Sequence, residues 1–417
     1  MLGRLALFSA LRHSQFRQLF VGQVVSNLGD WLTLLALLSL LLYEWDLGAL
    51  AWAAVLTAIA LPGAVVGPFA GVWADRWSRR TIMIGCDLAR AVVVLGLIWA
   101  RDLPTVVVLV GVLSLISAFF FPAQQSAIRL TVPETDLLAA SSLSQLANYG
   151  ARLLGPALGG ALVVFAGPRA AFGADSFSFL LSAACLWQLP PLRGKAIATG
   201  NNSSGFWQEL RSGLAYILGR RVLLVSVGGT IALGVIAGAT DALGTPVLKA
   251  LGVDEGMLGP SFTALGFGYV AAALAVGERG QRLPVIAVLG LALLALGVLF
   301  VLHGAAVALG LTGLLLALLV AFPARLLFGM SYGASQVASA YAVQQQTPAE
   351  FMGRVAATAR SLVTIVPLPA PLLAALLAER WGLGQTYAAA GVALGAAAIG
   401  VLALRTWALG SDSPRPD

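Results

Sequence analysis

Among the ionisable side chains within long apolar stretches of this sequence, six are singled out as able to carry charge chemistry: Asp30, Asp87, Arg90, Arg152, Asp241 and Arg325. A charge in a low-dielectric surrounding costs free energy. Such a group therefore pairs with an opposite charge, binds a charged ligand or exchanges a proton. All six are candidates for proton coupling or for contact with a substrate.

The same residues also allow a structural interpretation. Asp87 and Arg90 are three residues apart on one helical face, so they can neutralise each other. Asp30 can form a structural pair with Arg152 instead of carrying a proton. Both interpretations remain open for each residue at this point.

The composition indicates that lipid surrounds these groups. Of the 417 residues, 59% are hydrophobic and only 10% are charged, and the mean hydropathy is +0.90. Two cysteines and two distant histidines argue against a disulfide framework and a zinc site, and no phosphate-binding motif is present. The net charge of +7 is spread over short loops, which does not suit nucleic acid. We expect no enzymatic activity, no metal and no cofactor.

The apolar stretches predict an all-α polytopic membrane protein with twelve transmembrane helices in two six-helix bundles. A helix of roughly 20 apolar residues crosses the hydrocarbon core of a bilayer. Such stretches fall at 17–43, 50–74, 81–100, 104–127, 139–166, 170–189, 222–246, 257–277, 284–303, 308–337, 354–378 and 383–407. We expect bundles over 1–189 and 222–417, joined by a cytoplasmic linker over 190–221 that contains an amphipathic helix.

An internal repeat relates the two halves. At a constant offset of 215 residues, Pro133 aligns with Pro348, Pro156 with Pro371 and Gly167 with Gly382. Two parallel repeats predict a pseudo-two-fold axis along the membrane normal and a cavity between the halves. A chance alignment of alanine- and leucine-rich helices is the alternative.

Basic residues predict the orientation of the chain. Arg and Lys number about 18 in the loops on the side of the N-terminus and about 4 on the opposite side, and loops rich in these residues stay in the cytoplasm. We therefore expect a multi-pass protein of a bacterial-type inner membrane, with both termini in the cytoplasm.

Charge is concentrated in "GVWADRWSRR", residues 71–80, the turn between the second and third predicted spans. Its leading residue is Gly71, and its charged residues are Asp75, Arg76, Arg79 and Arg80. A degraded copy in the second half, "GERGQR", contains Glu278, Arg279 and Arg282 at the same spacing. A carboxylate is stabilised at a helix N-terminus, so the acidic residue of each stretch can hold a helix end. A plain positive-inside loop would explain the arginines but not Asp75.

The fifth predicted span contains "NYGARLLGPALGGALV". Pro156 removes a backbone hydrogen bond, so we expect a kink there. Gly155, Gly159 and Gly160 leave room for close packing, which we expect across the interface between the two halves. The alternative is a generic glycine-rich membrane helix.

These motifs resemble those of the major facilitator superfamily. The 71–80 stretch is similar to the family's motif between spans two and three, and the Pro156 segment is similar to the motif of its exporters. The segments "FRQLFVGQVVSNLGDWL", "FFFPAQQSAIRLTVPETDLLAASSLSQ" and "FGADSFSFLLSA" resemble the branch of macrolide-efflux pumps and the enterobactin exporter. The resemblance implies that the two loop motifs are cytoplasmic gates, with Asp75 meeting the eleventh span near 353–356. It also implies that Asp30, Asp241 and Arg325 line the central cavity.

The function that this resemblance implies is secondary export. We expect a monomer that moves an amphipathic small molecule, such as a drug or a siderophore, out of the cell by alternating access, coupled to inward proton flow. Its other partner is membrane lipid. A lysophospholipid or lipid transporter of the same fold and a non-transporting sensor or scaffold are the alternatives. The residues do not distinguish these substrates, because apolar cavity walls serve all of them.

Overall fold

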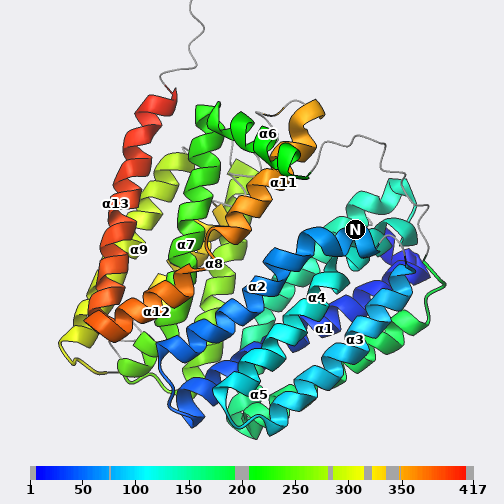
Figure 1. The fold of residues 1–417 in the computed structure, drawn as a ribbon, viewed down its shortest axis with the longest axis horizontal. Coiled ribbons are helices and arrows are strands. Elements are labelled where there is room, and N and C mark those ends of the chain that lie inside the picture. The colour runs from blue at the N-terminus through cyan, green and yellow to red at the C-terminus, as the bar shows by residue number, and fades with distance from the viewer. Residues whose placement is uncertain are drawn as a thin grey trace, which may run out of the picture. The chain divides into compact units, whose positions relative to one another are not determined.

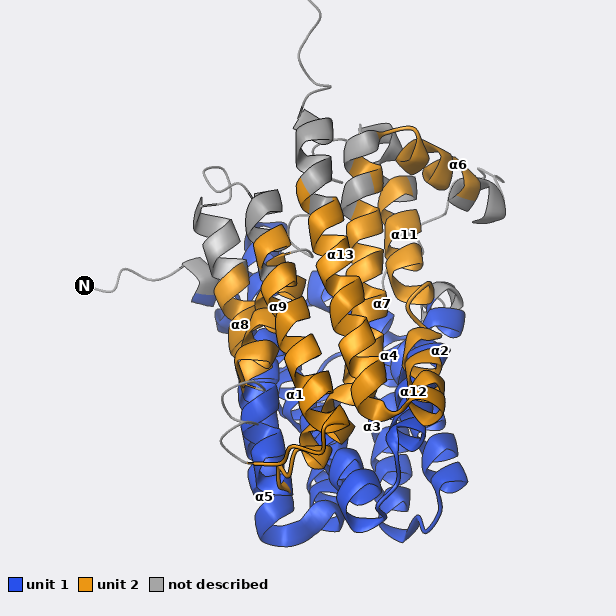
Figure 2. Cartoon of the chain, turned by 90° about the vertical axis from the view of Figure 1, so that its left-hand side faces the viewer, with its two compact units in different colours: residues 1–200, 255–263 blue, residues 201–254, 264–417 orange. Residues whose placement is uncertain are grey.

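The chain is mostly helical, with short connections, in the part that the computed structural model describes, residues 6–74, 77–192, 206–279, 285–313, 322–334, 347 and 349–409 (Figure 1). No strand occurs in these residues. The chain divides into two compact units, residues 1–200 with 255–263 and residues 201–254 with 264–417 (Figure 2). The predicted all-α class is confirmed.

The first unit is built from long helices that follow one another with short connections. They are η1 (Ala6–Arg12), α1 (Ser14–Ser39) with the π-helical turn η2 (Leu40–Glu44), α2 (Ala49–Ala74), α3 (Arg79–Gly96) with η3 (Leu97–Trp99), α4 (Leu103–Thr131), η4 (Glu134–Asp136) and α5 (Leu137–Trp187). Helix α1 packs along α5, α2 packs against α4, and α3 contacts both α4 and α5. Helices α1 and α3 therefore bring their polar residues to α5.

The second unit contains the remaining helices. They are α6 (Phe206–Leu218), α7 (Arg221–Ala250), most of α8 (Leu258–Arg279), α9 (Val285–Ala308), a helix over residues 322–334, α11 (Ala349–Ile365), α12 (Ala370–Trp381) and α13 (Leu383–Leu409). The short η5 (Glu255–Met257) and the first turns of α8 belong to the first unit. Helix α9 packs along α13, and α7 contacts both α12 and α13.

Each predicted span corresponds to a helix in the described residues, and two glycine breaks fall between predicted spans as expected. The differences are that α9 continues to Ala308, so residues 309–313 at the start of the tenth predicted span are not helical, and that one span is divided at two prolines. Helix α5 covers the fifth and sixth predicted spans, and its backbone leaves helical geometry at Gly167, where φ is +80°. Gly382, its repeat partner, has φ +94° and separates α12 from α13. Glycine tolerates this region because it lacks a Cβ. The eleventh predicted span is divided between α11 and α12, around Pro367 and Pro369, because proline lacks the N–H that a helix interior needs.

The surfaces of the helices are those of a multi-pass membrane protein. Eight helical stretches in the described residues are long and apolar enough to cross a membrane. Large apolar side chains such as Val92, Trp99 and Phe165 are exposed on them, at 71%, 67% and 87%. Exposure on this scale would be unfavourable in water, and it suits contact with lipid.

The predicted amphipathic linker helix is present as α6. Its Ile217 is buried with Leu223 and Val227 of α7 and with Val355 and Ala359 of α11. Helix α6 therefore packs through one face onto α7 and α11 within the second unit, as its amphipathic pattern allows.

Candidate functional site

The first unit contains a buried ion pair at the centre of α3. Asp87 and Arg90, which their spacing predicts to neutralise each other, are in direct contact, and both side chains are almost fully buried. The Arg90 guanidinium lies over the ring of Phe120 of α4 at 4.0 Å and over the ring of Phe179 of α5 at 4.4 Å. Because two aromatic faces and a carboxylate surround it, Arg90 is held in one position.

A third member of this cluster, Asp175 of α5, was not among the predicted site residues. It is completely buried. The Oγ1 of Thr33 donates a hydrogen bond to Asp175 Oδ2 at 2.6 Å, and the Oγ of Ser178 donates to Oδ1 at 3.0 Å. Asp175 lies in the apolar span 170–189, so the criterion that selected the six charged candidates also applies to it. The segment "FGADSFSFLLSA" was used only for its family resemblance.

The close approach of α1 to α5 requires a glycine. A Cβ at Gly29 would collide with the side chains of Ser178 and Asp175. Gly29 thus allows Thr33, one turn further along α1, to reach the Asp175 carboxylate. The next residue, Asp30, has an exposed side chain, in contrast to Asp175.

Asp30 interacts electrostatically with groups on both neighbouring helices. Arg90 and Asp87 of α3 act on it, and it in turn acts on Asp175. The structure therefore brings the predicted residues Asp30, Asp87 and Arg90 together and adds Asp175. Arg152 has an exposed side chain on α5, and its pairing with Asp30 remains a prediction.

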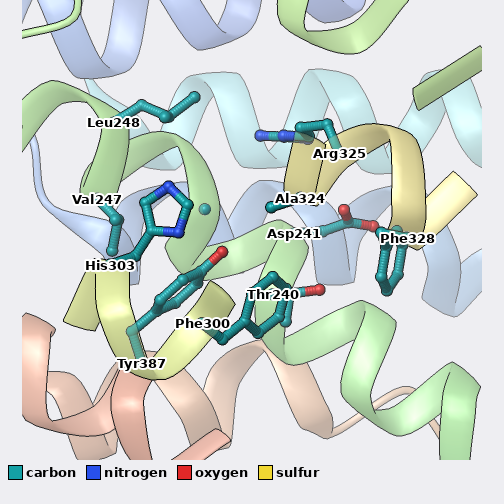
Figure 3. A pocket seen from close by; sticks show the side chains of 11 residues that line it. Thr240, Asp241, Val247, Leu248, Phe300, His303, Ala324, Arg325, Phe328 and Tyr387 are labelled. Carbon is teal, nitrogen blue, oxygen red and sulfur yellow. The ribbon is translucent and has the colours of Figure 1, made fainter. Parts of the chain in front are cut away.

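The second unit contains a separate polar cluster (Figure 3). The predicted residues Asp241 of α7 and Arg325 of the helix over 322–334 line one pocket and interact electrostatically. A Cβ on Gly244 would lie 3.3 Å from the Arg325 guanidinium, and Arg325 Nη2 lies 3.5 Å from Thr245 Oγ1. The free space amounts to only about 20 Å³, enough for about one water molecule. In this form the pocket is too small for an amphipathic substrate.

Two further residues of this pocket were not predicted as site residues. His303 of α9 and Tyr387 of α13 are both buried, and their rings meet edge to face at 6.1 Å. The Nδ1 of His303 donates to the carbonyl of Leu299 at 2.8 Å, because a carbonyl oxygen only accepts. His303 had been considered only as a zinc ligand, and Tyr387 lies in an apolar stretch with no motif around it.

The gate residues are described only in part. Asp75, Arg76 and Arg282 lie outside the described residues, Gly71 lies in the last turns of α2, and the side chains of Glu278 and Arg279 at the end of α8 are not described. The Nε of Arg79 donates to Ser126 Oγ at 3.2 Å, which links the start of α3 to α4. Arg80 donates to the carbonyl of Trp187 at 2.6 Å and lies over its ring. These two arginines thus anchor α3 within the first unit, and a gating role for the motif remains a prediction.

The glycines of the predicted exporter motif lie at tight helix contacts. A Cβ on Gly155 would lie 2.6 Å from the Trp31 side chain, and one on Gly159 would lie 3.0 Å from the Trp31 carbonyl. Gly160 faces Gly259 of α8, whose Cα would be 2.7 Å from a Cβ at 160. Pro156 is adjacent, but in α5 the backbone leaves helical geometry at Gly167 and not at Pro156.

Outside the membrane-spanning segments, a hydrogen-bonded cluster ties the N-terminal η1 to η4. His13 Nε2 lies 2.7 Å from Asp136 Oδ2, and Ser9 Oγ donates to Asp136 Oδ1 at 2.7 Å. The hydrogen bond to His13, followed by that to Ser9, lowers the pKa of Asp136. The cluster holds the start of the chain against the connection between α4 and α5.

Comparison with known proteins agrees with this architecture. The family profile described as Major Facilitator Superfamily matches residues 19–371. The uncharacterized MFS-type transporter YfiS of Bacillus subtilis (strain 168) is 26% identical over 383 residues, which cover 90% of this chain and 89% of YfiS. Macrolide efflux protein A of Streptococcus pyogenes is 29% identical over 164 residues, which cover 38% of this chain and 40% of that protein.

The fold is also similar to the crystal structure of a mutant of the nucleoside transporter NupG. The TM-score is 0.77 at 11% identity, and the match covers 94% of this chain and 99% of that chain. The predicted resemblance and the predicted twelve-helix fold are confirmed. The chain belongs to the major facilitator superfamily, and it is a multi-pass membrane transporter of that family.

Proposed function

We propose that this transporter is a secondary exporter that moves an amphipathic small molecule out across a bacterial inner membrane in exchange for protons. The observation that carries the proposal is the cluster of Asp30, Asp87, Arg90 and Asp175 in the first unit. Ionisable groups at membrane depth are costly and mark substrate, ion or proton sites in transporters. Partial similarity to macrolide efflux protein A supports export as the direction.

The proposed cycle is alternating access by two six-helix halves, 1–189 and 222–417, in a monomer with both termini in the cytoplasm. Its cytoplasmic gates are the 71–80 stretch and the 278–282 stretch. Tight contacts at Gly155 and Gly159 against α1 are well suited to helices that slide, because small residues allow backbone atoms to meet. Asp30 carries the proton from its exposed position, and Asp241 with Arg325 contributes a second polar site.

The substrate class is tested with purified protein in proteoliposomes. A panel of fluorescent amphiphiles, with macrolide-like, siderophore-like and lysophospholipid probes among them, is offered under an imposed pH gradient. We expect accumulation of at least one amphiphile against its gradient, and we expect a protonophore to abolish it. Selective movement of the lysophospholipid would favour a lipid transporter instead. Absence of flux for every probe, with intact fold, would favour a non-transporting sensor.

A further inference from the structure

Three carboxylates of the first unit share one arginine. Arg90 is the cation that acts on each of Asp30, Asp87 and Asp175. Its direct contact is with Asp87, whose second oxygen, Oδ2, is buried without a hydrogen-bond partner in the described part of the chain. If all three carboxyl groups were ionised, the cluster would carry two net negative charges.

Two uncompensated charges are unfavourable at this depth. Desolvation of an isolated carboxylate is costly, and like charges close together add to that cost. Thr33 and Ser178 satisfy the oxygens of Asp175 by hydrogen bonding, but hydroxyl groups add no positive charge. The direct way to lower the charge is to bind a proton.

We propose that Asp175 and Asp30 together bind one exchangeable proton, with Asp30 as the exposed end and Asp175 as the buried end of the site. Binding forms one O–H bond on a carboxylate oxygen and lowers the net negative charge of the cluster by one. Release breaks that bond and returns the proton to water at Asp30. The proton site itself does not depend on the proposed function. Only its role, to drive export with the bound proton, rests on proton-coupled export.

Geometry assigns distinct roles to the neighbouring groups. The charged and titratable groups around Asp175 are Asp30 from α1 and Arg90 from α3, with Asp87 and Cys86 beside Arg90. The Arg90 guanidinium stays in place when the proton binds or leaves the carboxyl groups, because it lies against the rings of Phe120 and Phe179. Thr33 belongs to the same helix as Asp30 and donates to Asp175, so a movement of α1 changes both ends of the site together.

The proton is observable without any substrate. Full-length protein carrying carbon-13 in its aspartate carboxyl groups is reconstituted in nanodiscs, and infrared difference spectra between pH values report the carboxylic acid C=O stretch. We expect a titrating aspartic acid band in the wild type that Asp175→Asn and Asp30→Asn each remove or shift. The variant that combines Asp30→Asn with Asp175→Asn should change the band no more than either substitution alone, because the two carboxyl groups share one proton. Asp254→Asn, an exposed loop position, is the matched control.

A second variant covers the case in which Asp175→Asn fails to fold. Thr33→Val keeps the Asp175 carboxyl group and removes one of its two hydroxyl donors, so the band should shift without being lost. An unchanged band in folded Asp175→Asn or in Thr33→Val would overturn the assignment of Asp175. A band that responds as expected in a protein whose efflux ignores the pH gradient would leave the proton site standing and refute coupled export. Coupled efflux that persists in Asp175→Asn would refute the site alone.

Discussion

The contact between Gly160 of α5 and Gly259 of α8 allows a quantitative test of the packing. An alanine Cβ at 160 would lie 2.7 Å from Gly259 Cα and 3.0 Å from its N, both backbone atoms. A flexible side chain can move away, but a helix backbone moves only with its whole turn. Overpacking of this kind costs about 1–3 kcal/mol.

The part of α5 beyond Gly167 contains a matched control. A Cβ at Gly173 meets no atom within 4 Å, so Gly173→Ala introduces no clash. Both substitutions gain roughly 0.5–1 kcal/mol from the better helix propensity of alanine, and this gain cancels in the comparison. The difference in unfolding free energy between the two variants therefore isolates the steric effect, about 1–3 kcal/mol.

The assay is reversible unfolding of each purified variant in the same detergent, followed by tryptophan fluorescence. We expect Gly173→Ala to be at least as stable as the wild type and Gly160→Ala to be less stable than both. Equal stability of the two variants would refute the conclusion that α5 and α8 meet backbone to backbone at this point.

Three further predictions concern charged residues. Asp87→Asn leaves the buried Arg90 without its direct partner and should cost about 3–5 kcal/mol of folding free energy, measured by the same unfolding assay; a neutral effect would contradict the pairing. Because the pKa of Asp136 is lowered, its bond to His13 stabilises the fold above the ordinary pKa of an aspartate, and this stabilisation is lost as pH falls through the lowered value. The protection factors of the η1 amides, which are corrected for the intrinsic pH dependence of hydrogen exchange, should therefore fall at acid pH, and Asp136→Asn should remove that fall. Asp75→Asn should insert normally and slow the transport cycle, and a normal rate at normal expression would refute its gating role.

The helices were predictable because each depends on a local pattern. Span length, the polar interval before α7 and the amphipathic pattern of α6 are all visible in the residues. The repeat aligned Gly167 with Gly382, and in the structure both adopt positive φ between helical segments, although the sequence analysis predicted no conformation for them. The division of the eleventh span around Pro367 and Pro369 was missed, because its hydropathy continues across both prolines.

The site was predictable only where partners are close in sequence. Asp87 and Arg90 share one helix, so their spacing fixed the pair. The proximity of Asp175 to Asp30 arises from the packing of α5 on α1 at Gly29, which no spacing reveals. His303 and Tyr387 likewise meet only through the packing of α9 on α13.

The most direct test of the account is substrate flux through Asp30→Asn in proteoliposomes, with and without a pH gradient, using the best probe of the amphiphile panel and Asp254→Asn as the control. If Asp30 carries the coupling proton, Asp30→Asn should lose accumulation driven by the gradient while keeping downhill exchange of substrate. Asp254→Asn should keep both. A well-folded Asp30→Asn protein that still concentrates substrate on a pH gradient would contradict proton coupling through this cluster.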